Sequence, residues 1–214
     1  MTVPDAGIGT AGVGRVGDAK LTNGREERRN REDVVRAAGR LFAERGFHGT
    51  SMRDLGGELG MLGSSLYSHI GGKAELLLEV IGRGSAMFQA LADEVLAADV
   101  APTEQLRRLI EGHVGIVVGH IDIARTFLNE ARFLGDAEHG TVVEMRDRYE
   151  KAYRTVLERG RAAGELPGVA DPRLAAIFIL SILNSVDRWY RPDGGVTPEE
   201  LAVDIHRFVL DGLG

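Results

Sequence analysis

Residues 47–77 read FHGTSMRDLGGELGMLGSSLYSHIGGKAELL, and the order of apolar and polar residues in this stretch decides the fold. Thr50 or Ser51 is suited to begin a helix, because a side-chain oxygen there can accept hydrogen bonds from the first free backbone N–H groups. An apolar face follows at three- and four-residue spacing, formed by Met52, Leu55 and Leu59. This periodicity predicts a short helix that buries one side.

The second half of the stretch predicts a second short helix that packs on the first. Gly60 ends the first helix, where a left-handed residue is needed. Leu66 falls where the second helix must meet the first. The polar residues left pointing outward are Ser64, Ser65, Tyr67, Ser68 and His69. A helix-turn-helix needs this division between an apolar side that joins its helices and a polar side that enters the major groove of DNA.

These residues resemble the TetR family of bacterial one-component repressors. The shared pattern consists of Gly46-Phe47, Thr50-Ser51, Gly60, Leu66-Tyr67-Ser68-His69 and Lys73. Two positions depart from it, since Gly56 stands where the family usually has alanine and Ile70 where it usually has phenylalanine. Gly56 and Gly57 within one short helix cost about 1 kcal/mol each relative to alanine. The departure concerns the rigidity of this helix more than the identity of the motif.

The resemblance implies roles for the matching residues and a partner, double-stranded DNA with a palindromic operator. The side chains expected at phosphates, where they fix register without reading sequence, are Thr50, Ser51, Tyr67 and Lys73. Those expected nearest base edges are Ser64, Ser65 and His69. For each serine the alternative is a solvated surface hydroxyl or a helix cap.

Composition excludes several classes of protein. The chain has 214 residues and no cysteine, so disulfides, thiolate catalysis and cysteine-ligated zinc are ruled out. No stretch reaches about eighteen apolar residues without a charge, so no membrane span is expected. The N-terminus lacks an apolar signal core, and we therefore expect a cytoplasmic protein.

The net charge of −6 is unevenly divided along the chain. Residues 25–73 carry nine basic and seven acidic side chains, whereas residues 74–214 carry fifteen basic and twenty-three acidic ones. A basic segment beside an acidic body is expected when only one part of a protein meets phosphates. The charge distribution thus supports DNA binding by the N-terminal part.

Residues 1–24 are rich in glycine, alanine and threonine and have no hydrophobic period, which predicts a disordered tail. Gly7, Gly9 and Gly12 spell the spacing of a dinucleotide-binding loop. Such a loop requires a strand before it and a helix after it. Only the residues MTVPDA precede the first glycine, so the flexible tail is the favoured interpretation.

The rest of the chain predicts an all-α protein of about nine helices, without strands. A helix-turn-helix domain of three helices is expected over residues 25–72, and a ligand-binding and dimerisation domain over residues 73–214. The helices expected outside residues 47–72 span about 27–45, 73–98, 102–120, 121–134, 138–163, 171–190 and 198–213. Several begin at recognisable caps, among them Asp171-Pro172 and the capping box of Thr197 and Glu200.

The segment LAAIFILSILNSVDRW, residues 174–189, is apolar nearly all round. A helix of this kind is buried on two sides. One chain of short helices covers only one side comfortably, so a second copy is expected to supply the other. In the TetR family the last two helices of each subunit form a four-helix bundle across a two-fold axis, and the resemblance therefore implies a homodimer. Its two DNA-binding domains would lie roughly 34–36 Å apart, or a little more.

A second resemblance concerns the ligand. The segment SVDRWYRPDGGVTPEEL, residues 185–201, resembles the family branch that controls fatty-acid and sterol breakdown, which implies a small hydrophobic effector of the acyl-CoA class. Such a ligand needs an apolar slot and arginines for its phosphates. The candidate lining residues are Phe88, Phe127, Phe133, Asn184 and Trp189, with Arg125, Asn129 and Arg132 at the polar end. The alternative is that the aromatic residues are plain core and the arginines are solvated.

Two other functional classes are alternatives to a repressor, an enzyme and an interaction module. An enzyme that acts on acyl-CoA would need a nucleophile with its base, a metal cluster or a phosphate loop, and the sequence offers none of these. His113 and His120 are seven residues apart, whereas metal ligands on one helix favour a spacing of four. Both are therefore expected to be core or pocket histidines and not metal ligands. We therefore expect no cofactor or metal and no catalysis. A helical interaction module that has lost DNA binding is the remaining alternative, favoured only by Gly56 and Ile70.

Overall fold

The computed structural model describes residues 17–61, 66–67 and 70–213, and this part of the chain is helical throughout, with no strand. Eight α-helices and one 3-10 turn follow each other along it. They are α1 (Gly17–Gly49), α2 (Met52–Leu59), α4 (Lys73–Ala97), α5 (Pro102–Gly119), α6 (Ile121–Asn129), η1 (Ala131–Phe133), α7 (Asp136–Ala162), α8 (Pro172–Trp189) and α9 (Pro198–Leu213). None of these helices combines the length and apolar character needed to cross a membrane.

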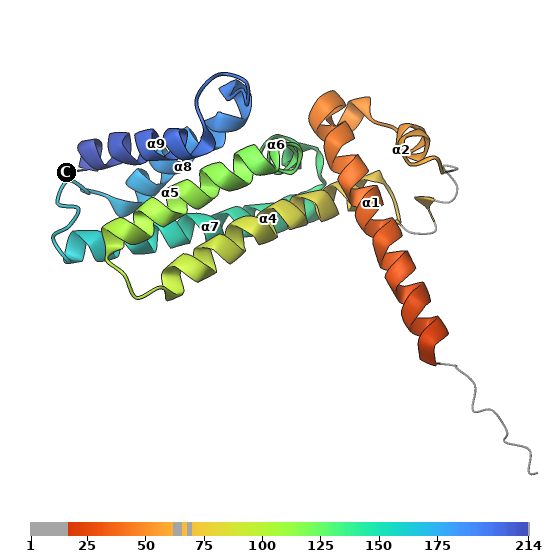
Figure 1. Cartoon of the computed structure of the whole chain (residues 1–214), viewed down its shortest axis with the longest axis horizontal. Helices are drawn as coiled ribbons and strands as arrows, with labels where there is room; N and C mark the ends of the chain where they lie inside the picture. The colour runs from red at the N-terminus through yellow and green to blue at the C-terminus, as the bar shows by residue number, and fades with distance from the viewer. Residues whose placement is uncertain (1–16, 62–65, 68–69, 214) are drawn as a thin grey trace, which may run out of the picture.

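The helices form an N-terminal domain and a helical body (Figure 1). Helices α1 and α2 lie together at one end of the molecule, and α5 to α9 form an elongated bundle that extends away from them. Helix α4 belongs to both parts, because it packs on α1 near its start and on α5, α6 and α7 further along. The body contacts the N-terminal domain chiefly through α6, which lies against α1.

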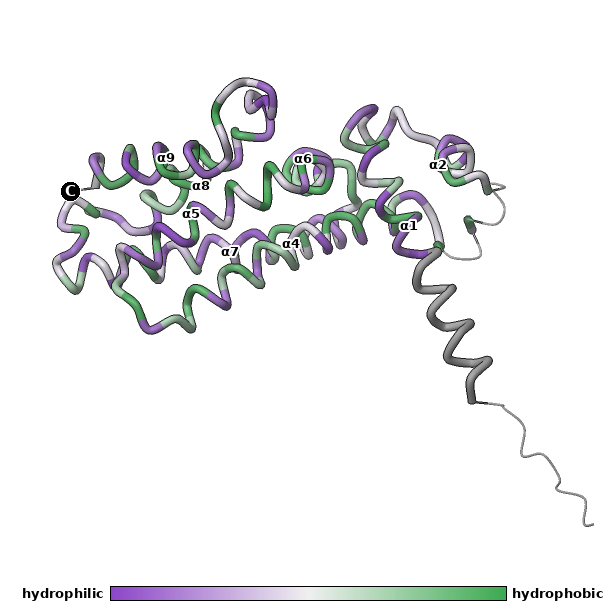
Figure 2. Tube along the Cα trace, viewed as in Figure 1, coloured by the Kyte–Doolittle hydropathy of each residue, from purple (hydrophilic) through white to green (hydrophobic). Residues whose placement is uncertain are grey.

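The core of the body is built around α5, which packs on α4, α7, α8 and α9. Its apolar residues recur at three- and four-residue intervals, and those fully buried are Leu106, Leu109, Ile110, Val114 and Val117. Figure 2 shows that apolar and polar residues also alternate along the turns of the other helices. The amphipathic period of the sequence is therefore what packs the bundle.

Several predicted helix ends are confirmed. Gly60 has a φ of 64° and its N–H is bonded to the carbonyls of Gly56 and Gly57, so it ends α2 in the left-handed conformation. Asp171 accepts hydrogen bonds from the backbone of Arg173 and Leu174 at the start of α8. These ends agree with the sequence because each depends on a few neighbouring residues.

The capping box before α9 is also confirmed. The backbone N–H of Thr197 donates to Glu200 Oε2 at 2.9 Å, and the N–H of Glu200 donates to Thr197 Oγ1 at 3.1 Å. The two residues thus satisfy each other's free N–H groups.

Two helices differ from the prediction. Helix α1 begins at Gly17, ten residues before the expected start at Glu27 and inside the segment predicted to be a tail; residues 1–16 lie outside the described part. Residues 17–33 are rich in straight-chain side chains and lack proline, which favours a helix. The helix predicted over 121–134 ends at Asn129 and continues only as the 3-10 turn η1. This break lets Glu130 and Phe133 point toward the N-terminal domain.

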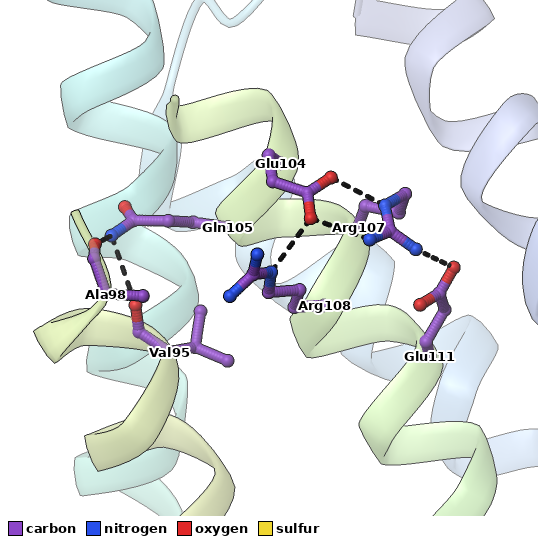
Figure 3. A network of polar contacts seen from close by, with 7 residues as sticks. All are labelled: Val95, Ala98, Glu104, Gln105, Arg107, Arg108 and Glu111. Atoms are coloured by element: carbon purple, nitrogen blue, oxygen red, sulfur yellow. Dashed lines mark hydrogen bonds and ion pairs between the residues drawn. The ribbon is translucent and has the colours of Figure 1, made fainter. Parts of the chain in front are cut away.

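A polar network fixes the turn between α4 and α5 (Figure 3). Gln105 Nε2 donates to the carbonyls of Val95 and Ala98 at 3.1 and 3.0 Å, which closes the end of α4. Beside it, Glu104 accepts hydrogen bonds from Arg107 and Arg108, and these bonds lower the pKa of its carboxyl to about 2. The bonds of Gln105 thus fix the start of α5 against the end of α4.

Candidate functional site

The N-terminal domain is built on an apolar core that α1, α2 and the start of α4 share. Its buried side chains include Phe42, Phe47, Leu55, Leu66 and Ile70. Ile70 thus fills the core position that the family usually gives to phenylalanine. Gly46, with a φ of 74°, interrupts α1 as predicted and turns the chain toward α2. Glycine suits this position because a left-handed backbone strains other residues.

Thr50 orders this turn from inside. Its side chain is 1% exposed, and its hydroxyl lies within hydrogen-bond distance of the carbonyls of Leu41 and Gly46, at 3.1 and 3.0 Å. Its backbone N–H donates to the carbonyl of Phe47. Both donors of Thr50 are therefore used within the chain, and a phosphate contact does not follow from this placement.

Lys73, at the start of α4, stabilises the turn between α1 and α2. Its ammonium donates to the carbonyls of Phe47 and Thr50 at 2.8 and 2.9 Å and lies 4.2 Å from the centre of the Phe47 ring. An ammonium has three N–H donors, so one remains for a further acceptor. The position that the resemblance assigns to phosphate binding is thus also a structural anchor.

The outer face of the N-terminal domain carries Ser51 and Tyr67. Ser51 is exposed and forms a capping box with Asp54, whose carboxyl has a lowered pKa because it accepts hydrogen bonds from the Ser51 hydroxyl and backbone. Tyr67 is 57% exposed, a high value for an aromatic side chain. Ser64, Ser65 and His69, the residues predicted nearest base edges, lie outside the described residues.

Glu130 joins the body to the N-terminal domain. Its Oε2 accepts a buried hydrogen bond of 2.6 Å from the backbone N–H of Phe47. Phe133 stacks on the Phe47 ring with centroids 6.1 Å apart, and His48 meets Phe133 edge-on at 4.6 Å. On the same side, the hydroxyl of Thr126 lies within hydrogen-bond distance of the carbonyls of Asp122 and Gly39, at 2.9 and 3.3 Å. The segment from α6 to η1 therefore binds the C-terminal part of α1 through one buried hydrogen bond and aromatic contacts.

Loss of the hydrogen bond between Glu130 and the Phe47 N–H is expected to lower the stability of the protein. In Glu130→Ala the buried N–H of Phe47 loses its acceptor, and we expect the free energy of unfolding to fall by about 2 kcal/mol. Thermal unfolding should then occur about 4–8 °C lower. Glu130→Gln, which keeps a carbonyl acceptor, should lose less than half as much. Equal losses in the two variants, measured by calorimetry, would show that the contact to Phe47 N–H is unimportant.

A cavity of about 480 Å³ opens in the body between α4, α5, α6, α7 and α8. This volume suits a small organic ligand. The lining residues from α4 to α6 are Phe88, His113, Phe127, Leu128 and Asn129. Those from α7 are Arg146, Asp147, Tyr149 and Glu150, and those from α8 are Ile177, Leu180, Ser181, Asn184, Ser185 and Arg188.

The cavity has an aromatic end and a polar end. Phe88, His113, Phe127 and Tyr149 are all buried and form a cluster in which the Phe88 ring lies 4.8–5.6 Å from the other three. Asp147, Ser181 and Arg188 are exposed and mark the opening between α7 and α8. A ligand in this cavity would meet apolar surface at depth and charged groups at the opening.

The structure brings together half of the predicted ligand residues. Phe88, Phe127, Asn129 and Asn184 line the cavity. The other four, Arg125, Arg132, Phe133 and Trp189, lie outside its lining.

Each of these four has a different place. Arg125 donates to the carbonyl of Asp187 at 2.7 Å, and the Arg132 guanidinium lies over the Phe133 ring. Phe133 faces Phe47, as described above. Trp189 is 52% exposed near the end of α8, where its indole N–H donates to Ser185. Arg132 and Phe133 leave the predicted face because α6 ends at Asn129.

Arg146, an unpredicted lining residue, links the cavity to α6. Its Nη2 donates to the carbonyls of Phe127 and Leu128 at 2.7 and 3.0 Å. Its Nε is buried without a hydrogen-bond partner among the described residues, and burial lowers the pKa of the guanidinium. No sequence signal pointed to this residue, because it is one of several arginines on the long polar helix α7, and such residues usually lie in solvent.

His113 lines the cavity, in agreement with its expected role as a core or pocket histidine and not a metal ligand. His120 is exposed and is not among the lining residues. Among the residues that the structure describes, no group of three or more metal-ligating side chains occurs.

Burial of His113 predicts a loss of stability in acid. Its pKa is lowered to about 3 by desolvation, whereas an unfolded chain protonates histidine near 6.5. Below pH 6.5 the unfolded chain therefore binds a proton at His113 that the folded chain does not bind. The free energy of unfolding decreases as the pH is lowered, until about pH 3. We expect His113 alone to lower the free energy of unfolding by about 1 kcal/mol between pH 6 and pH 5.

The measurement is urea unfolding at several pH values of the unmodified protein and of His113→Leu, which cannot titrate. All other groups are shared, so the difference in pH slope belongs to His113. Parallel stability curves over pH 4–6.5 would contradict the neutral buried state.

An apolar face lies uncovered on α8 and α9. Phe178 is 63% exposed and Phe208 is 69% exposed. They border a groove of about 630 Å³ that also includes Leu174, Ile182 and Val209. The other side of α8 is buried in the body through Ala176, Ile179, Leu183 and Val186. The described residues thus cover this nearly all-apolar helix on one side only.

Both the N-terminal domain and the helical body match known protein families. Residues 34–80 match the family described as "Bacterial regulatory proteins, tetR family". Residues 99–213 match "Tetracyclin repressor-like, C-terminal domain", and this match alone covers more than half of the chain.

Individual relatives match over most of their length. The HTH-type transcriptional repressor KstR2 of Rhodococcus jostii (strain RHA1) is 29% identical over 194 residues, which are 90% of this chain and 94% of the relative. The crystal structure of PfmR, a TetR family regulator of Thermus thermophilus, has a TM-score of 0.78 and 33% identity over 85% of this chain and 98% of its own. AibR, crystallised with isovaleryl coenzyme A and operator DNA, has a TM-score of 0.78 over 83% of this chain and 96% of its own; at 24% identity this likeness concerns the fold.

Proposed function

This chain belongs to the TetR family of bacterial regulatory proteins, and we propose that it is a dimeric DNA-binding repressor that leaves its operator when a small hydrophobic ligand fills the cavity. The observation that supports the proposal is that one segment, residues 127–130, both lines the cavity and contacts the N-terminal domain. Phe127, Leu128 and Asn129 line the cavity, and the next residue, Glu130, holds the backbone of Phe47 in the N-terminal domain. A ligand that displaces this wall therefore acts directly on the domain proposed to bind DNA.

The proposed DNA contacts are made by the outer face of the N-terminal domain. Exposed Tyr67 and the third N–H of Lys73 meet phosphates, which fixes register. Exposed Ser51 joins them when its hydroxyl turns from the Asp54 carboxylate, to which it donates in this structure. Ser64, Ser65 and His69 stay predicted base-edge residues. A regulator of this kind acts on the chromosome, so the proposed location is the cytoplasm.

The proposed dimer uses the uncovered face of α8 and α9. Large exposed aromatic residues such as Phe178 and Phe208 are costly in water, and an apolar patch of this kind usually marks an interface. A two-fold axis through this face would place the N-terminal domains of the two copies apart on one side, as a palindromic operator requires.

The proposed effector is an acyl-CoA of lipid or sterol catabolism. The buried aromatic end suits an apolar acyl group, and the unpartnered Nε of Arg146 suits an oxygen of the ligand. AibR, which shares the fold, binds isovaleryl coenzyme A. The activity is binding alone, and no cofactor takes part.

Release from DNA requires only that the ligand binds the DNA-incompetent state more tightly. A near-complete switch needs about 5.5 kcal/mol of differential affinity. Arg146 is suited to transmit it, because the same guanidinium faces the cavity and holds the carbonyls of Phe127 and Leu128.

The test is a gel shift of the protein with the DNA upstream of its own gene, at one stated salt concentration, because phosphate contacts make the affinity salt-dependent. We expect specific binding that is lost on addition of a long-chain or steroid acyl-CoA and kept with free coenzyme A. Specific binding that no acyl-CoA weakens would retain the repressor and overturn the ligand class. A folded dimer that binds no upstream fragment would favour the interaction module instead.

A further inference from the structure

The aromatic end of the cavity contains a polar atom that has no partner among the described residues. His113 is 1% exposed and lies in the cavity lining on α5. Its Nδ1 is 3.2 Å from the hydroxyl of Tyr149 on α7. Its Nε2 is buried, and no described residue forms a hydrogen bond with it. A buried polar atom of this kind needs a partner, and the residue that carries it lines the cavity.

The surroundings of His113 are apolar. The ring of Phe88 lies 4.8 Å from the imidazole and 5.6 Å from the ring of Phe127, between centroids. Burial in this cluster keeps the imidazole neutral over the physiological range, since its pKa is lowered to about 3. The site therefore offers a hydrogen bond without a charge, so it does not select an anion such as a phosphate or a carboxylate.

A neutral imidazole has one N–H donor and one bare nitrogen acceptor. If Tyr149 donates to Nδ1, then Nε2 carries the proton and seeks an acceptor. If Nδ1 donates to Tyr149, then Nε2 is bare and seeks a donor. A hydroxyl group can donate or accept, so it satisfies Nε2 in both tautomers.

We propose that the ligand of this cavity carries a hydroxyl group on its apolar skeleton and that His113 Nε2 binds this hydroxyl at the aromatic end. The inference rests on the proposed function and narrows its ligand class from hydrophobic molecules to hydroxylated ones. The exposed groups at the opening, among them Ser181 and Arg188, bind the other end of the ligand. Recognition at two separated polar points discriminates against a plain hydrocarbon chain, which would bury Nε2 unpaired.

Two small probes that differ by one hydroxyl test this assignment. Naphthalene and 2-naphthol are both smaller than the cavity and neutral at pH 7. Transfer of a hydroxyl from water into a purely apolar site is unfavourable, so a site without a partner prefers naphthalene. We expect the protein to bind 2-naphthol at least ten-fold more tightly than naphthalene in a fluorescence titration.

Variants assign the preference to one atom. In His113→Leu the preference for 2-naphthol should vanish or reverse, so that naphthalene binds equally well or better. His113→Gln, which keeps a polar group, should retain part of the preference for 2-naphthol. The matched control is His206→Leu, because His206 on α9 also has a buried Nε2 without a partner among the described residues but lies outside the cavity lining. This control should keep the full preference.

Nitrogen NMR of protein labelled in histidine gives an independent readout. The Nε2 resonance of His113, assigned by its absence in His113→Leu, should move with 2-naphthol and stay in place with naphthalene. The shift itself is measured on the unmodified protein. If the leucine variant fails to fold, His113→Gln supplies the assignment and the inference stays testable.

Three results would overturn the inference: equal or tighter binding of naphthalene by the unmodified protein, a preference for 2-naphthol that survives in His113→Leu, or no binding of either probe. None of them decides the proposed function. Operator binding and its loss with acyl-CoA are measured separately by gel shift, and their outcome does not depend on whether the ligand carries a hydroxyl.

Discussion

Phe208→Asp is expected to convert the protein to a monomer and to weaken operator binding by more than about a hundred-fold. Phe208 is 69% exposed on α9 and borders the apolar groove with Leu174, Phe178 and Ile182 of α8. In the proposed dimer this groove meets its copy across the two-fold axis, so each interface would bury two unpaired carboxylates. A buried unpaired charge costs several kcal/mol, which exceeds the surplus that holds most dimers together.

The measurement combines analytical ultracentrifugation with a gel shift, and the control is Val143→Asp. Val143 is also an exposed apolar residue, at 42%, but it lies on α7 outside the groove. The control should remain dimeric and bind the operator with unchanged affinity. A dimer that persists in Phe208→Asp would place the interface on another face. A monomer that binds the full operator as tightly as before would remove the need for two DNA-binding domains.

Lys73→Met is expected to lower the free energy of unfolding by about 3 kcal/mol. The substitution keeps an apolar stem but removes hydrogen bonds from an ammonium to the carbonyls of Phe47 and Thr50, and it removes the cation from the face of the Phe47 ring. Hydrogen bonds to charged groups contribute about 1.5–3 kcal/mol each. Thermal unfolding should shift down by about 6–12 °C.

The same variant tests the second role proposed for Lys73. If its third N–H binds a phosphate, the slope of operator affinity against salt should become shallower by about one unit, measured at a temperature where the variant is folded. Arg53→Met is the control for stability, because Arg53 is exposed on α2 and should change the free energy of unfolding by less than about 0.5 kcal/mol. A stable Lys73→Met with a reduced salt slope would make Lys73 a phosphate ligand alone.

The N-terminal domain was largely readable from the sequence. The end of α2 at Gly60 and the interruption of α1 at Gly46 were predicted and are confirmed. The cap was predicted at Thr50 or Ser51, and it lies at Ser51. Each depends on the backbone preferences of two to four adjacent residues, so local sequence is sufficient. The same reasoning explains why the start of α8 at Asp171 and that of α9 at Thr197 were found.

The side chains of the candidate sites were predicted less completely. The resemblance to the family implied a phosphate contact for Thr50, but its hydroxyl faces the carbonyls of Leu41 and Gly46. Arg125 and Asn129 were expected on one ligand-facing side of a helix. Asn129 lines the cavity, whereas Arg125 is bonded to the carbonyl of Asp187. Helical spacing shows which residues share a face, but it does not show what that face meets.

The sequence by itself determined the all-helical class, most helix ends and the family, because amphipathic periods and caps are properties of neighbouring residues. Only the tertiary structure decided which residues form the cavity. Phe88, His113, Arg146 and Asn184 come from four helices, and no sequence spacing relates them. It also decided that Glu130 reaches Phe47, 83 residues away, because that contact depends on the break in α6 and on the packing of α6 against α1.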